Sequence, residues 1–311
     1  MKGLLLRMLD SRLLGTALHH VFGRSLRADE KILGFTNPFL ARNLVVDRDG
    51  SRYVAPLDSY LVARSPERQL VRFDGGAYEP EISYLIRLLV SPDDTVVDIG
   101  ANVGLHTVAM AKAAHRGHVH AFEPVAEMAE KNSINCALNN LRNVSLWQCG
   151  LGKSDGELTM NVNVAGAGLE GTSSFMETDH IAARPDHYQA RRVPVRRLDD
   201  VMAQIKPSGR IALIKIDTEG SEPSVLEGAI EVIRTHRPAM IVEAHSTRLR
   251  AVGKNFRWYL DTFPNHHIFT IPSITSANPW FRLDPLISEP DEVCVNLLLL
   301  PRNAALTSSS P

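Results

Sequence analysis

The sequence predicts an α/β fold in which buried strands alternate with helices along the chain. Three observations lead to this prediction. Residues 95–107 are an apolar run that ends in an acid and opens into a glycine-containing turn before a helical pattern. A second apolar run ends in Glu123, about one strand–helix–strand unit later. Continuous apolar runs at 211–217 and 239–245 alternate with helical patterns, as strands buried on both faces do.

The remaining elements follow from apolar periodicity and from Gly, Pro and Asn breaks. Further strands are expected at 143–149, 267–271 and 293–300, and an edge strand at 157–164. Helices are expected at 81–90, 105–114, 126–139, 223–234 and 255–262, with a short helix after Leu198. Asparagines at 132, 135 and 139 are poor helix formers inside the second crossover helix.

Length and composition indicate one large domain with an N-terminal extension. The chain has 311 residues, 44% of them hydrophobic and 22% charged. We expect an extension at 1–75, the main domain at 76–301 and a frayed tail at 302–311. The 34 Lys and Arg residues balance 35 Asp and Glu, so no global field attracts nucleic acid. A polynucleotide partner is therefore disfavoured.

The extension begins with an amphipathic helical pattern at residues 4–22. We expect this segment to pack on the main domain or to join two copies of the chain, with peripheral membrane contact as a lesser alternative. Arg7, Asp10 and Arg12 interrupt the apolar run, so neither a signal peptide nor a membrane span is expected. The predicted location is the cytoplasm. Residues 35–75 mix prolines with short β-like runs, which indicates irregular structure with small strands.

Cys136, Cys149 and Cys294 lie in apolar stretches without Cys-x-x-Cys spacing. This pattern is typical of small buried side chains in a reducing compartment. Neither a disulfide framework nor a zinc site is expected.

The turn that follows the first core strand is the first candidate for ligand binding. It contains Asp98, Gly100, Asn102 and Gly104. Glycines permit the tight turn and let a ligand lie against the backbone, at the end of the sheet where α/β proteins bind nucleotides. A sharp strand-to-helix turn without a ligand is the alternative interpretation.

Glu123 and Pro124 follow the second strand, where a carboxylate can accept both hydroxyls of a ribose. The turn lacks the three-glycine form of dinucleotide sites. Asp98 would repel a phosphate but attract an α-amino group, as a partner of that group or of the turn itself. A cationic nucleoside amino acid, S-adenosylmethionine, therefore fits better than NAD.

Several motifs resemble the FkbM family of S-adenosylmethionine-dependent methyltransferases, over roughly residues 75 to 300. They lie at residues 97–104, 121–124, 132–140, 198–200 and 215–222. The resemblance implies a Rossmann-like class I fold with a seven-stranded, mostly parallel sheet, helices on both faces and an antiparallel last strand. It implies O-methylation of a small molecule or sugar, in secondary metabolism or on a glycan, and it places Tyr78-Glu-Pro80 near the cofactor. A helix-entry turn is the alternative for that tripeptide.

Gly150 and Leu151 open a glycine-rich loop after the third strand. Sheet geometry allows this loop to clamp the adenine, with Leu151 as an apolar wall, although a plain β-turn fits as well. Gly171-Thr-Ser-Ser174 matches a segment that follows the adenine loop in the family.

Five arginines between residues 184 and 197 favour an anionic substrate group or, as is usual for such runs, a solvated face.

Acidic groups and a histidine gather at the ends of the later strands. Asp217 and Glu219 follow the fourth strand, and Glu243 and His245 lie two residues apart at the end of the fifth. Period-two geometry directs the latter pair to one face. We expect His245 to act as the general base, with Glu243 holding it or the acceptor, and Asp217 and Glu219 orienting the acceptor and the methionine end of the cofactor.

Other roles remain open for these residues. Asp217, Glu219 and Glu243 have the chemistry of a Mg²⁺ site, as in some other O-methyltransferases. In a structural alternative, Glu243 pairs with Lys215 and His245 caps the next loop. An NAD-dependent oxidoreductase and a non-catalytic nucleotide-binding module are the alternative functions of the chain.

Overall fold

The structure is a computed structural model, and it describes residues 44–46, 51–54, 79–164, 173–176, 179–207, 209–273, 283–291 and 293–302. The predicted helix at 4–22, most of the extension, Gly171 and the tail from residue 303 lie outside these ranges.

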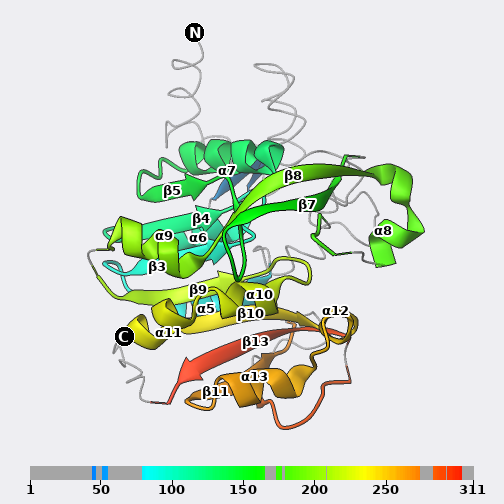
Figure 1. The fold of residues 1–311 in the computed structure, drawn as a ribbon. Helices are drawn as coiled ribbons and strands as arrows, with labels where there is room; N and C mark the ends of the chain where they lie inside the picture. Colours follow the sequence, from blue (N-terminus) through cyan, green and yellow to red (C-terminus); the bar gives the residue numbers. More distant parts are fainter. Residues whose placement is uncertain are drawn as a thin grey trace, which may run out of the picture.

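The centre of the fold is an eight-stranded sheet in the order β12-β11-β13-β10-β9-β3-β4-β5 (Figure 1). Its strands are β3 (Thr95–Ile99), β4 (His118–Phe122), β5 (Val144–Trp147), β9 (Ile211–Ile216), β10 (Ala239–His245), β11 (His266–Ile271), β12 (Asp284–Pro285) and β13 (Cys294–Pro301). The strands from β10 to β5 are parallel, whereas β13 is antiparallel to both of its neighbours.

All seven core strands expected from the sequence are present, and the eighth is the two-residue β12 at the edge. The 157–164 run differs from expectation because it leaves the main sheet. It forms β7 (Gly156–Asn163), which joins β8 (Tyr188–Arg196) and β6 (Gly150–Leu151) in a separate three-stranded sheet. A small hairpin of β1 (Leu44–Val46) and β2 (Arg52–Val54) confirms short strands in the extension.

Helices cover both faces of the main sheet. They are α5 (Pro80–Leu89), α6 (Leu105–Ala113), α7 (Ala126–Leu138), α8 (Asp179–Ala183), α9 (Leu198–Ile205), α10 (Glu222–Glu227), α11 (Ile230–His236), α12 (Ser246–Ala251) and α13 (Phe256–Thr262), with a 3₁₀ turn at Pro185–His187. None of the described helices is long and apolar enough to cross a membrane.

Successive side chains of the buried strands point to opposite faces of the sheet, so a hydrophobic core lies on each face. Val97 and Ile99 face a core shared with α9, α10, α11 and α13. Val96, between them, faces the opposite core with α5 and α6. This two-sided burial explains the continuous apolar strands in the sequence.

Three helical segments differ from the prediction. The helix expected at 223–234 is broken into α10 and α11 at Gly228, where an added Cβ would lie 2.0 Å from the carbonyl oxygen of Gly152. Asp199 then accepts a hydrogen bond from the amide of Val232 in the first turn of α11. The short helix α8 and helix α12, directly after β10, were not expected.

The cysteine prediction is partly wrong. Cys136 and Cys149 are buried, but Cys294 is exposed at the start of β13. All three are free thiols.

Candidate active site

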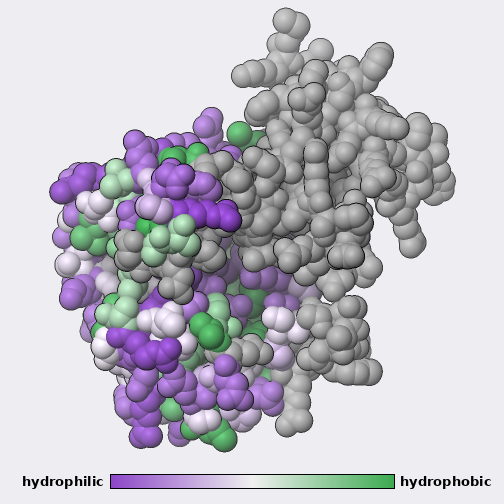
Figure 2. Space-filling view, turned by 90° about the vertical axis from the view of Figure 1, so that its right-hand side faces the viewer, coloured by the Kyte–Doolittle hydropathy of each residue, from purple (hydrophilic) through white to green (hydrophobic). Residues whose placement is uncertain are grey.

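The candidate site lies where the strand order reverses. From β3 the chain continues to β4 and β5 on one side, and later returns through β9 and β10 on the other. Open α/β sheets bind ligands at such a switch point, outside the carboxyl ends of the strands. Figure 2 shows the side of the molecule on which α12 lies. The described surface there is mainly hydrophilic, with small separate hydrophobic patches.

The turn between β3 and α6 depends on its glycines. Gly100 and Gly104 have φ angles of +77° and +89°. A Cβ on Gly100 would lie 1.7 Å from the carbonyl oxygen of Asp217. The two glycines therefore let the turn form and let the loop after β9 pack directly against it.

Two buried asparagines of α7 hold this turn. Asn132 donates through Nδ2 to Thr107 Oγ1 at 3.1 Å and to the Asn102 carbonyl at 3.4 Å. Asn135 donates to the Val103 carbonyl at 2.6 Å. Sequence reasoning treated these asparagines only as poor helix formers. Because residues three apart lie on the same face of a helix, the spacing of Asn132 and Asn135 could have indicated that both point to one neighbouring segment.

Asp98 is fully buried, and its Oδ2 accepts a hydrogen bond from Thr107 Oγ1 at 2.6 Å. Its Oδ1 has no hydrogen-bond partner. Of the two roles predicted for Asp98, this contact matches the one that fixes the turn.

Glu123 lies directly after β4 and accepts backbone hydrogen bonds from Asn102 and Val125, both at 2.8 Å. Burial raises the pKa of Glu123 to about 7, against the lowering effect of these two bonds. The carboxylate thus ties the glycine turn to β4 at the predicted ribose position, and Pro124 beside it is also buried.

Gly150 and Leu151 form β6 in the three-stranded sheet. Phe175 is so close to Gly150 that a Cβ there would lie 2.9 Å from its ring. The Leu151 side chain is buried in the main core. The adenine-clamping role of this loop stays a prediction.

The loop after β9 directs Glu219 towards the neighbouring strand ends. Buried Glu222 accepts hydrogen bonds from the backbone amides of Thr218 and Gly220 and from the Thr218 hydroxyl. Glu219 has a φ angle of +56°, in the left-handed region, and its carbonyl accepts a bond from Ser174 Oγ at 2.7 Å. A strained residue held in this way is a frequent mark of a functional site.

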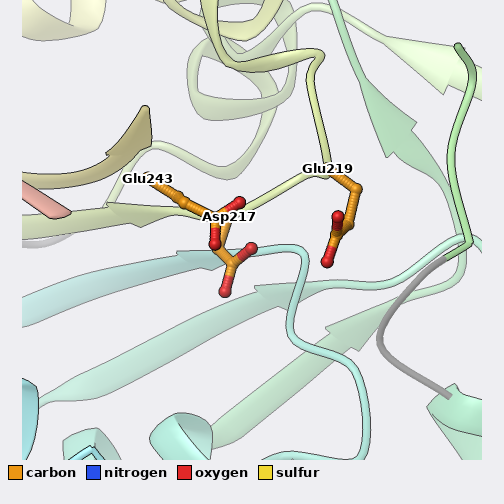
Figure 3. A group of neighbouring side chains, drawn as sticks. All are labelled: Asp217, Glu219 and Glu243. Carbon is orange, nitrogen blue, oxygen red and sulfur yellow. The ribbon is translucent and has the colours of Figure 1, made fainter. Parts of the chain in front are cut away.

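The structure brings Asp217, Glu219 and Glu243 together, as Figure 3 shows, with one carboxylate oxygen from each within 4.8 Å of the others. Arg248 of α12 contacts two of them, Glu219 Oε2 at 2.5 Å and Glu243 Oε2 at 3.2 Å. Arg248 was missed in the sequence because α12 was not expected.

Burial raises the pKa of Glu219 to about 7, opposed by Arg248. Burial and the charges of Asp217 and Glu219 raise the pKa of Glu243 well above its ordinary value. In this acidic cluster, Glu219 and Glu243 are therefore more readily protonated than surface carboxylates.

Lys215 pairs with Asp217, its Nζ 3.1 Å from Oδ2. Burial disfavours the charged form of Lys215, but the carboxylates of Asp217, Asp98 and Glu79 outweigh that effect and raise the pKa of the lysine. The ion pair between Glu243 and Lys215, considered from the sequence, is replaced by the pair with Arg248.

His245 ends β10 and is the residue before α12. Its Nδ1 lies 2.8 Å from Thr247 Oγ1. It stands two residues beyond Glu243 and outside the group of three carboxylates.

The arginine-rich segment forms contacts typical of a solvated face. Four of its arginines bond to neighbouring polar side chains: Arg191 to Glu127, Arg192 to Glu157, Arg196 to Gln204 and Arg197 to Asp199. These contacts favour the solvated alternative over an anion site.

A glycine turn at the switch point, strand-end acids on β4, β9 and β10, and an antiparallel strand beside the last parallel one define a Rossmann-like class I methyltransferase fold. The family profile described as "Methyltransferase FkbM domain" matches residues 98–269, more than half of the chain. The protein belongs to the FkbM methyltransferase family.

Two individual relatives are also named as methyltransferases. "Methyltransferase 1" of Beauveria bassiana is 30% identical over 147 residues, 44% of this chain and 59% of that protein. "Methyltransferase sdnD" of Sordaria araneosa is 31% identical over 159 residues, 44% of this chain and 60% of that protein. The matches thus span less than two thirds of either relative.

Among solved structures, the methyltransferase FkbM of Methylobacillus flagellatus is 18% identical with a TM-score of 0.39, over 67% of this chain and 44% of that one.

Proposed function

We propose that this protein transfers a methyl group from S-adenosylmethionine to a hydroxyl oxygen of a small molecule or sugar. The observation that carries the proposal is membership of the FkbM family, combined with a glycine turn and acidic residues at the carboxyl ends of β4, β9 and β10. The residues suit this cofactor: the turn carries glycines, which let a ligand lie close to the backbone, and Glu123 follows β4, where a ribose-binding carboxylate is expected. Bound S-adenosylmethionine supplies an electrophilic methyl on a sulfonium.

The protein then has to align the acceptor hydroxyl with that methyl and to accept its proton. Asp217, Glu219 and Glu243 are the groups that would orient the acceptor, because their carboxylates converge at the strand ends next to the glycine turn. His245 is the proposed base, since an imidazole suits proton transfer at neutral pH. Glu219 is the competing base, because its pKa of about 7 gives it the same property.

Isothermal titration of the purified chain with S-adenosylmethionine, S-adenosylhomocysteine and NAD tests the cofactor assignment. We expect both adenosyl compounds to bind and NAD not to bind. Binding of NAD alone would favour the oxidoreductase alternative. A screen of glycosides and other hydroxylated metabolites with methyl-labelled cofactor then tests turnover, and tight S-adenosylhomocysteine binding without turnover on any of them would favour a non-catalytic module.

Once an acceptor is found, variants decide the base. His245→Ala should lower turnover by about 10²–10⁴ with little change in cofactor affinity. More than half of the wild-type rate in this variant would move the role to Asp217, Glu219 or solvent. Glu219→Gln, measured in parallel, separates these options.

A further inference from the structure

Asn296 interrupts an otherwise apolar strand, β13. Cys294 and Val295 precede it, and four leucines follow it. Asparagine is disfavoured in strands, and a polar group inside a sheet costs free energy unless it has a partner. Within the described part of the chain, the half-buried Asn296 side chain makes no hydrogen bond, and its amide atoms keep contact with solvent. This amide is therefore open to a partner that binds from outside.

Asn296 points to the same face of the main sheet as Glu243. Leu297 of β13 and Val242 of β10 belong to the core on the α13 face. Leu298 belongs to the opposite core, on the α5 face. Because side chains alternate along a strand, Asn296 and Glu243 both point to the α5 face.

Asn296 and Glu243 are also direct neighbours across two strands. β10 and β13 are antiparallel, with Glu243 opposite Asn296 and His245 opposite Cys294. The Cβ atoms of opposite residues lie about 4.5–5.5 Å apart, and diagonal neighbours lie farther apart. The diagonal neighbour Cys294 already forms a side-chain hydrogen bond with Glu243. One small ligand over this face can therefore contact Glu243 and Asn296 together.

Glu243 keeps hydrogen-bonding capacity for such a ligand. Arg248 bonds to its Oε2 at 3.2 Å, and the Glu243 side chain remains 22% exposed. A carboxylate has about four acceptor sites on its two oxygens, so this contact does not saturate it. Asn296 adds an uncharged donor and acceptor, and its neighbour on the other side is the buried, apolar Ile271 of β11. An acid beside an amide suits two adjacent hydroxyl groups better than it suits a second charge.

We propose that Glu243 and Asn296 bind two adjacent hydroxyl groups of the methyl acceptor, so that the acceptor is a vicinal diol and Asn296 selects it. This inference rests on the proposed function and narrows the acceptor to a compound with a second hydroxyl beside the methylated one. The hydroxyl at Glu243 lies on the side of His245, the proposed base. The hydroxyl at Asn296 identifies the acceptor.

Paired acceptors test this assignment. Methyl-labelled S-adenosylmethionine is supplied with methyl glycosides and cyclohexane-1,2-diols, and with partners in which one hydroxyl is replaced by hydrogen. For the best acceptor, removal of the neighbouring hydroxyl should lower kcat/KM of the wild type about tenfold or more, because the Asn296 amide loses its partner. In Asn296→Leu, which removes the amide at similar size, the two compounds should differ by less than about threefold. S-adenosylhomocysteine affinity, measured by isothermal titration, should not change in this variant.

Thr270→Val is the matched control. Thr270 lies on the neighbouring strand β11, opposite Leu297, and therefore on the α13 face of the same sheet. The change removes a hydroxyl from the strand without touching the proposed acceptor face. This variant should keep the wild-type preference for the diol.

Equal kcat/KM values of the wild type for the diol and its deoxy partner would overturn the proposal. An undiminished preference in Asn296→Leu would overturn it as well. If Asn296→Leu no longer binds S-adenosylhomocysteine, Asn296→Ala decides by the same comparison. A wild-type chain that binds S-adenosylhomocysteine but methylates none of the diols also contradicts the diol assignment, while the cofactor assignment stands. If the wild type does not bind S-adenosylhomocysteine at all, the proposed function itself fails.

Discussion

Gly104 and Asn132 pack directly against each other in the glycine turn: a Cβ on Gly104 would lie 2.5 Å from both Cγ and Oδ1 of Asn132. Asn132 is fully buried and hydrogen-bonded, so it has no room to move away. The turn, α6 and α7 are therefore fitted to one another at this point.

Gly104→Ala should destabilise the protein by about 2–4 kcal/mol. Alanine would be strained in the left-handed backbone conformation of this position, and its Cβ would overlap the side chain of Asn132. Urea unfolding measures this loss. Gly209→Ala is the control, since a Cβ there meets nothing within 4 Å, and it should change stability by less than about 0.5 kcal/mol. In the double variant Gly104→Ala/Asn132→Ala the overlap is removed, so its loss should be smaller than the sum of the single losses. Additive losses would show that the contact does not matter.

Cofactor affinity should depend on pH through Glu123. The pKa of this carboxyl group is raised to about 7, so it is mostly protonated at pH 6 and mostly ionised at pH 8. Only the ionised form accepts two ribose hydroxyls, so S-adenosylhomocysteine should bind about tenfold more tightly at pH 8 than at pH 6. Glu123→Gln should weaken binding by about 1–3 kcal/mol and remove this part of the pH dependence. An equally steep pH dependence in the variant would assign the titration to another group.

Arg248→Ala should be more harmful at high pH than at low pH. Without the guanidinium, Glu219 and Glu243 are buried carboxyl groups with raised pKa and no positively charged partner, and the pKa of about 7 keeps Glu219 neutral near pH 5.5. As pH rises through about 7, Glu219 must ionise without a partner, so the loss of unfolding free energy should grow towards about 3–5 kcal/mol at pH 8. Unfolding by urea across this pH range measures the trend.

Arg250→Ala is the matched control on the same helix. Its ion pair with Glu289 is exposed, so the loss should stay below about 1 kcal/mol at every pH. A loss in Arg248→Ala that does not vary with pH would mean that the arginine acts only by packing.

Turnover should survive removal of divalent metal ions. Three carboxylate oxygens within 4.8 Å could hold Mg²⁺, but Arg248 already bonds to two of the three carboxylates and supplies the countercharge. We therefore expect full activity after exhaustive treatment with EDTA. Loss of activity that Mg²⁺ restores would establish the metal site that the sequence allowed.

The strands and most helices could be predicted because their apolar runs are long and uninterrupted, as in Ile211–Ile216. The break between α10 and α11 could not, because Gly228 meets Gly152 only after folding. The same limit applies to the site. Asp217 and Glu243 follow from strand ends, and the parallel register of β9 and β10 sets them side by side. Arg248 and Asn132 act through contacts between distant segments, which residue spacing does not reveal.

Ser174 connects the three-stranded sheet to the acidic cluster. Its backbone pairs with Asn161 of β7, and its hydroxyl donates to the carbonyl of Glu219. Met176, two residues later, packs against Gly220. A segment outside the main sheet thus holds the backbone of Glu219, a member of the acidic cluster. Replacement of Ser174 would therefore move Glu219 within the acidic cluster while leaving the hydrogen bonds of Asn132 and Glu123 to the glycine turn in place.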